Sequence, residues 1–84
     1  MLERLTEMFV GKRVLITNFG NSNRKIEGVC KAIHPVNGHE GIFNMELDSP
    51  GAWQSFVPEN ITESSVEGPF DSLIGGRRKV EIIS

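Results

Sequence analysis

Apolar residues at the start of the chain recur at spacings of three and four. Leu2, Leu5, Met8 and Phe9 therefore fall on one face of a helix, and charged residues occupy the opposite face. This pattern predicts a short amphipathic helix over residues 1–9. After Gly11 the helical periodicity stops, and short apolar runs alternate with Gly, Asn, Pro and Ser, which is typical of a β-domain.

Five of these runs predict strands. They cover residues 13–19, 26–34, 43–48, 53–57 and 79–84. Gly28 lies inside the second run and predicts a bend or a close approach of two strands, whereas residues 59–72 are rich in Ser, Glu, Gly and Pro and predict a loop. Because closure keeps a few short strands from exposing long edges, we expect residues 1–84 to form one mostly β domain. Its predicted architecture is a short N-terminal helix followed by a five-stranded, strongly bent antiparallel small barrel.

Composition limits the kind of function to expect. A net charge of −2 and a pI near 5.6 give no general basic field, so contact with nucleic acid would need a local basic patch. The single cysteine, Cys30, sits in an apolar stretch and is expected to be a small buried hydrophobe rather than a nucleophile. The chain shows no signal-peptide pattern and no apolar run of membrane-spanning length, which predicts a soluble cytoplasmic protein.

The order of helix, bent three-stranded meander and two further strands resembles the Sm-like proteins. The part similar to the first Sm motif runs from Gly11-Lys12-Arg13-Val14 through Gly28 to Asn37 and residues 44–47, and Ile74-Gly75-Gly76 before residues 80–83 is similar to the second. The chain departs from the family at His34-Pro35, where an aspartate normally precedes the loop asparagine, and in placing Arg77 and Arg78 after the glycines. SH3-like and Tudor-like barrels share the strand count and are the alternatives.

The resemblance implies a homo-oligomeric ring in which the fourth strand of one subunit pairs with the last strand of its neighbour. The interface residues that it implies are Phe56, Val57, Val80, Ile82 and Ile83. The apolar character of residues 80–83 agrees with a strand that is covered by a partner.

The resemblance also implies that single-stranded RNA binds at turns facing the pore. The residues in these turns are His34, Asn37, His39, Arg77 and Arg78, whose side chains can stack on bases, read base edges or pair with phosphate. The alternative is that these are ordinary polar turns, in which Asn, Gly and His are common.

Other kinds of chemistry find little support in the sequence. His34 and His39 with Glu40 do not make a metal-ligand set at zinc spacing, and no catalytic or nucleotide-binding motif occurs, so we expect no metal, no cofactor and no enzyme activity. We expect Trp53 to pack in the core or in an interface. The leading hypothesis is an RNA-binding ring, and the alternative is a protein-interaction adaptor that uses the helix face or an apolar patch around Trp53 and Phe56. A small nucleotide bound between subunits is a third possibility.

Overall fold

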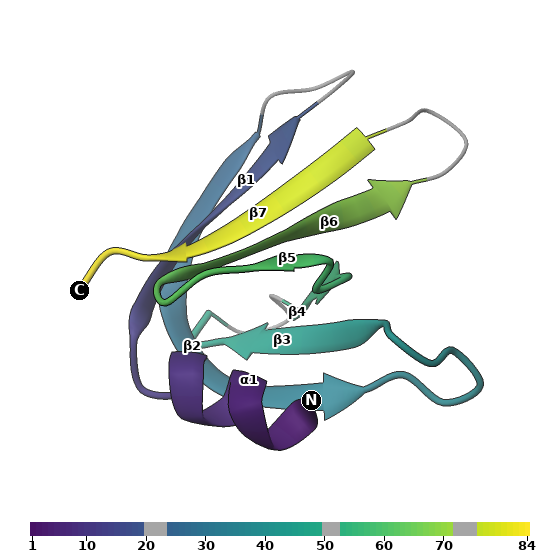
Figure 1. Ribbon diagram of the computed structural model, residues 1–84. Helices are drawn as coiled ribbons and strands as arrows, with labels where there is room; N and C mark the ends of the chain where they lie inside the picture. Colours follow the sequence, from purple (N-terminus) through teal and green to yellow (C-terminus); the bar gives the residue numbers. More distant parts are fainter. Residues whose placement is uncertain (20–23, 50–52, 72–75) are drawn as a thin grey trace.

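The chain folds as one short helix and an antiparallel sheet of seven strands, as seen in a computed structural model (Figure 1). The structure describes residues 1–19, 24–49, 53–71 and 76–84. The elements are α1 (Leu2–Phe9), β1 (Arg13–Phe19), β2 (Lys25–Pro35), β3 (Phe43–Leu47), β4 (Trp53–Phe56), β5 (Asn60–Ile61), β6 (Ser65–Asp71) and β7 (Gly76–Ile82). Hydrogen bonding joins the strands in the order β4-β3-β2-β1-β7-β6-β5, so β4 and β5 are the two ends of the sheet.

Helix α1 confirms the amphipathic pattern at the start of the chain. Leu5 and Phe9 are fully buried and Met8 is half-buried, whereas the charged residues of the helix face solvent. The helix lies against β2 at the base of the sheet (Figure 1). The rings of Phe9 and of Phe56 from β4 meet edge-on, with centroids 6.5 Å apart. The helix therefore covers one end of the core.

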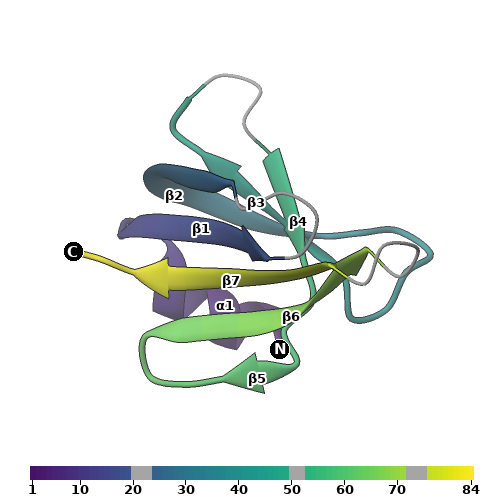
Figure 2. The ribbon, with the colours of Figure 1, turned by 90° about the horizontal axis from the view of Figure 1, so that it is seen from above.

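Strand β2 is long and bent, and it joins two parts of the sheet. Its first half pairs with β1 and its second half with β3, and the register shifts between Cys30 and Ala32. At Gly28 a Cβ atom would lie 2.9 Å from Oδ1 of Asp48 and 3.4 Å from Cβ of Leu47, so the expected close approach is confirmed. Figure 2 shows the result, with β3 and β4 crossing behind β1, β7 and β6.

The prediction of a loop over residues 59–72 is wrong, because this stretch contains β5 and the whole of β6. The last strand also begins earlier than expected, at Gly76, and ends at Ile82. The sheet thus has seven strands rather than five, and its hydrogen-bonded order does not close on itself.

Tertiary contacts explain why β6 was missed. Among the side chains of β6 that the structure describes, the buried apolar one is Val66, which pairs with Val80 of β7. Gly68 and Pro69, which usually indicate a loop, lie inside the strand. A Cβ atom on Gly68 would come within 1.8 Å of the carbonyl oxygen of Val57, so glycine is required where the chain leaving β4 crosses β6.

The core is formed by one cluster of buried apolar side chains from the helix and from six of the strands. Its members are Leu5, Phe9, Val14, Ile16, Cys30, Ile33, Phe43, Met45, Leu47, Phe56, Val66 and Val80. The alternation predicted for β3 is confirmed, and Cys30 is buried as expected. In the part of the chain that is described, no helix has the length and apolar character needed to cross a membrane.

Candidate functional site

Among the Phe and Trp side chains that the structure describes, Trp53 is the most exposed. It is 49% exposed at the beginning of edge strand β4, so it does not pack in the core of its own chain, and the alternative expectation that it packs in an interface stays a prediction. Its indole lies flat against the imidazole of His34 from β2, with ring centroids 4.5 Å apart and an angle of 13° between the planes. Because β2 and β4 flank β3, the two rings meet above the outer face of β3.

The ring pair is bonded to β3 through the imidazole of His34. Nε2 of His34 lies 3.0 Å from Oε1 of Glu46, and both side chains are partly exposed. Glu46 is also the register partner of Trp53, so one carboxylate lies between the two strands that carry the rings. Beside it, Oγ of Ser55 donates a hydrogen bond of 2.6 Å to Oδ1 of Asn44. The outer face of β2, β3 and β4 is therefore an ordered polar surface with one exposed indole.

The side chain of Arg78 lies on the core side of the sheet and not on the outer face that carries Trp53. It is only 7% exposed, and its Nε donates to Oδ1 of Asn18 on β1 at 2.7 Å. Its Nη1 donates to the backbone carbonyl of Ser55 on β4, and burial lowers the pKa of its guanidinium. Arg78 thus links β7 to β4 across the side of the sheet where these strands are not paired.

Arg77, the neighbour of Arg78, faces solvent and is paired with two carboxylates. Its Nε lies 3.2 Å from Oε1 of Glu67 and its Nη2 lies 3.3 Å from Oε1 of Glu59. These hydrogen bonds, first to Glu67 and then to Glu59, raise the pKa of the Arg77 guanidinium. Both arginines that were expected to meet phosphate therefore lie within β7 and are engaged by groups of the chain itself.

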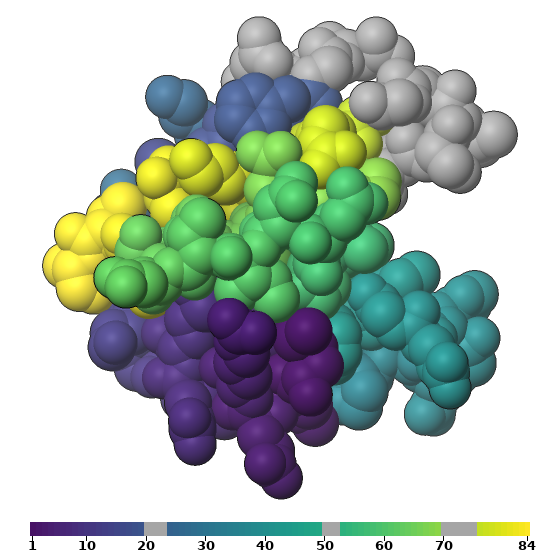
Figure 3. All heavy atoms as spheres, viewed as in Figure 1, coloured from purple at the N-terminus to yellow at the C-terminus, as the bar shows by residue number. Residues whose placement is uncertain are grey.

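Asn37 and His39 lie in the exposed loop between β2 and β3, which stands out from the body of the protein (Figure 3). Gly38 and Gly41 adopt φ values of +79° and +85° there, as tight turns require. A hollow lined by residues 35–43 lies within this loop. Of the five residues predicted to bind RNA, His34 belongs to the ring pair with Trp53, whereas Asn37 and His39 belong to this separate loop.

The predicted interface residues occupy several environments. Phe56 and Val80 are buried in the core of their own chain, Val57 and Ile82 are half-buried, and Ile83 is 43% exposed. Strand β7 pairs with β1 along one edge and with β6 along the other, so it offers no free edge over the residues paired in this way. The free ends of the sheet are β4 and β5. Assembly of the chain stays a prediction.

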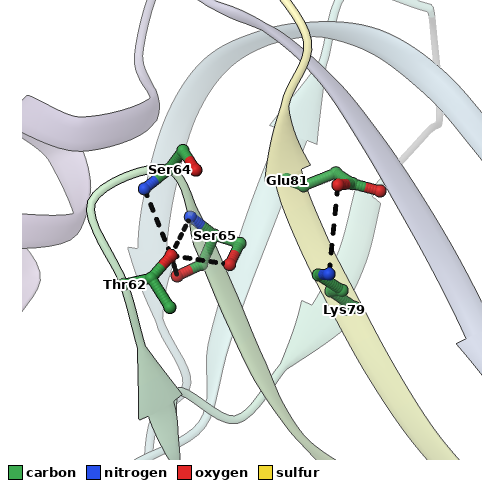
Figure 4. Close-up of polar contacts among 5 residues, drawn as sticks. All are labelled: Thr62, Ser64, Ser65, Lys79 and Glu81. Atoms are coloured by element: carbon green, nitrogen blue, oxygen red, sulfur yellow. Dashed lines mark hydrogen bonds and ion pairs between the residues drawn. The ribbon is translucent and has the colours of Figure 1, made fainter.

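The hydroxyl groups between β5 and β6 form a turn. Oγ1 of Thr62 accepts hydrogen bonds from the backbone N–H groups of Ser64 and Ser65, at 3.2 and 3.0 Å, and lies 2.8 Å from Oγ of Ser65 (Figure 4). On β7, Nζ of Lys79 lies 4.0 Å from Oε2 of Glu81 (Figure 4). Side chains that could act as a nucleophile or a base are thus paired locally in this region.

Burial also governs the chemistry of Cys30. It raises the pKa of the thiol to about 11, so the group stays protonated at neutral pH. Within residues 1–19, 24–49, 53–71 and 76–84, no three His, Cys, Asp or Glu side chains come together as metal ligands would.

The ring pair of Trp53 and His34 is the feature that the sequence analysis missed. A signal for it was available, because Trp53 and Phe56 are three residues apart in a strand and must therefore face opposite sides. Comparison with protein-family models, curated proteins and solved structures finds no match to this chain.

Proposed function

We propose that this chain is a non-enzymatic binding domain that contacts a partner protein through Trp53 on strand β4. The observation that carries the proposal is an indole that is 49% exposed yet held in one orientation by His34. Tryptophan is among the residues that contribute most often to binding energy at protein interfaces. With about 250 Å² of surface on the side chain and roughly 25 cal/mol per Å², covering the exposed half is worth about 3 kcal/mol.

Electrostatics favours a protein partner over RNA. The net charge is −2, Arg77 is paired with Glu59 and Glu67, and Arg78 is buried. Arg13 likewise has its Nη1 atom 3.1 Å from Oε2 of Glu27. Since RNA affinity depends on cations that are free to meet phosphate, these pairings weaken the case for a phosphate backbone as the main ligand.

Single-stranded RNA remains the second candidate, and the flat ring pair favours it. An exposed indole whose plane is fixed can stack on a base of any sequence. Under this hypothesis the exposed part of Trp53 would take the base, and Lys31, which is exposed on β2, is a candidate to meet phosphate. The Sm-like resemblance points to this class of ligand.

We infer that the sheet curls into an incomplete small barrel of the Sm-like or SH3-like kind. The crossing of the chain from β4 to β6 supports this inference, because the N–H of Glu59 donates to the carbonyl of Glu67 at 3.1 Å and Val57 lies directly over Gly68. If such barrels assemble into a ring, β4 of one chain would meet the β5 end of the next. A ring would therefore compete with other partners for the edge of β4.

Photo-crosslinking tests the proposal. Benzoylphenylalanine replaces Trp53 in the chain expressed in its native cells, and the same replacement of Phe19, which is 43% exposed, is the matched control. We expect a discrete adduct at position 53 that survives nuclease and is digested by protease. The adduct protein, once identified and purified, should bind the wild-type chain and the Phe19→Ala variant equally, and Trp53→Ala at least about tenfold more weakly.

Three other results would count against this function. A nuclease-sensitive adduct at position 53 would favour RNA, and an adduct between two copies of the chain would favour assembly. Crosslinking at position 53 no stronger than at position 19 would mean that Trp53 is not a contact residue at all.

A further inference from the structure

The loop that joins β2 to β3 contains an asparagine followed directly by a glycine. Asn37 and Gly38 are both exposed, and the loop extends away from the body of the protein (Figure 1). The N–H of His39 donates to the carbonyl of Val36 at 3.2 Å, and Gly38 has a φ of +79°, whereas no described residue other than glycine has a positive φ. These features define a type II turn with Asn37 and Gly38 at its two central positions.

The two groups of this turn that could react with each other are unengaged. Among the described residues, the side-chain amide of Asn37 and the backbone N–H of Gly38 have no hydrogen-bond partner. A Cβ built on Gly38 meets no atom within 4 Å, so the space beside its nitrogen is open. Glycine accepts either sign of φ, and a rotation about the Cα–C bond of Asn37 can therefore bring the Gly38 nitrogen against Cγ of Asn37. The turn bond from His39 to Val36 is lost in this rotation.

The other asparagines that the structure describes lack this combination. Asn18 is buried and its Oδ1 accepts a hydrogen bond from β7, and Oδ1 of Asn44 accepts one from β4. Asn60 is exposed, but the next residue is Ile61, whose branched Cβ crowds the backbone nitrogen. Exposure, a free amide and an unhindered neighbouring nitrogen thus meet at Asn37.

We propose that Asn37 is a site of spontaneous covalent modification, at which the chain converts its own asparagine into aspartate or isoaspartate. The Gly38 nitrogen gives its proton to hydroxide and bonds to Cγ of Asn37. The bond from Cγ to the side-chain nitrogen breaks, and ammonia leaves after taking a proton from water. The product is a five-membered cyclic imide, and nothing is oxidised or reduced. Because both groups belong to adjacent residues, no second molecule has to be positioned for this step.

Water opens the imide at either of its two carbonyl carbons. Addition at Cγ of Asn37 breaks its bond to the Gly38 nitrogen and leaves an ordinary aspartate. Addition at the backbone carbonyl carbon breaks the original peptide bond and leaves isoaspartate, in which the main chain runs through the former side chain. The open hollow lined by residues 35–43 gives water access to this loop.

Both products change the loop between β2 and β3. Each adds a negative charge close to Glu40. Isoaspartate also adds one carbon to the main chain within the turn that the bond from His39 to Val36 closes, and within the wider loop that the bond from Val36 to Ile42 closes at 3.2 Å. Since an i to i+3 turn depends on a fixed number of backbone atoms, the isoaspartate form should lose this turn.

Incubation of the purified folded chain at mildly alkaline pH, followed by proteolysis and mass spectrometry, tests the proposal. We expect the mass gain of an amide replaced by a carboxylate to accumulate in the peptide that contains Asn37. A methyltransferase specific for isoaspartate should label the same peptide. Asn18, Asn44 and Asn60 are internal controls in the same sample and should remain amides over the same period.

Two variants identify the reacting groups. Gly38→Ala keeps the amide but places a methyl group beside the attacking nitrogen, and should slow the conversion roughly tenfold, which corresponds to about 1.4 kcal/mol in the barrier. Asn37→Ser removes the amide and should abolish isoaspartate labelling of this peptide. Far-ultraviolet circular dichroism checks that both variants remain folded.

Equal rates in the wild type and in Gly38→Ala would overturn attack by the Gly38 nitrogen. Conversion of Asn18, Asn44 or Asn60 as fast as that of Asn37 would overturn the selection of this site by exposure and turn geometry. A synthetic peptide of residues 34–42 supplies the last comparison. If this peptide converts while Asn37 in the folded chain stays unchanged, the inference that the folded loop permits the reaction is wrong.

Discussion

The adjacent arginines of β7 allow a sharp test of how the fold is held together. Arg78→Met keeps an apolar stem of similar length and removes the donors to Asn18 and to the Ser55 carbonyl. Hydrogen bonds from a charged group contribute about 1.5 to 3 kcal/mol each, and relief from burying the guanidinium offsets part of this loss. We therefore expect the free energy of unfolding to fall by about 2 kcal/mol, which lowers Tm by roughly 10 °C in a domain of this size.

Arg77→Met is the matched control. It alters the next residue of the same strand, but the pairs that it breaks, with Glu59 and Glu67, are largely exposed to solvent. Exposed ion pairs contribute little to stability, so we expect only a small change in Tm.

Urea unfolding followed by far-ultraviolet circular dichroism measures both variants. A cycle with Asn18→Ala isolates the contact at 2.7 Å, and its coupling energy should be about 1 kcal/mol or more. Equal, small effects of Arg77→Met and Arg78→Met would refute the argument that Arg78 connects β7 to β4. Greater loss from Arg77→Met would refute the assignment of the two side chains to opposite faces.

Two further predictions concern the backbone and the buried thiol. Gly68→Ala places a Cβ within 1.8 Å of the Val57 carbonyl oxygen and should lower the free energy of unfolding, measured in urea, by more than about 3 kcal/mol. Gly38→Ala is the control, because Gly38 has a φ of +79° but no atom within 4 Å of the added Cβ, and it should lower the free energy of unfolding by about 1 kcal/mol. Similar losses in the two variants would contradict the close crossing of β6 by the chain at Val57. Burial raises the pKa of the Cys30 thiol from 9.0 to about 11. The contribution of the protonated thiol to the free energy of unfolding is therefore fully present below pH 9 and is lost as the pH rises toward about 11. Between pH 7.5 and 10.5 the wild type should therefore lose about 2 kcal/mol more stability than Cys30→Ala, and parallel losses in the two proteins would contradict this.

Local patterns along the chain were sufficient for the helix and for several strands. The spacing of Leu5, Met8 and Phe9 predicts α1, and strict alternation predicts β3, because both signals depend only on which side of a single element faces the core. The β-branched and aromatic residues within 13–19 predict a strand, and β1 has the same bounds in the structure. Burial of Cys30 also followed from its apolar neighbours.

Only the tertiary structure decided which elements meet. Strand β6 contains Gly68 because the backbone of Val57 crosses it, a contact between distant segments that leaves a loop-like signature in the sequence. Arg77 and Arg78 are alike in composition, yet alternation within β7 sends one to surface carboxylates and the other to the core side. The sequence by itself determined the faces of single elements, whereas the pairing of β2, β3 and β4 brought Trp53 and His34 together, because strand neighbours depend on contacts that no local pattern encodes.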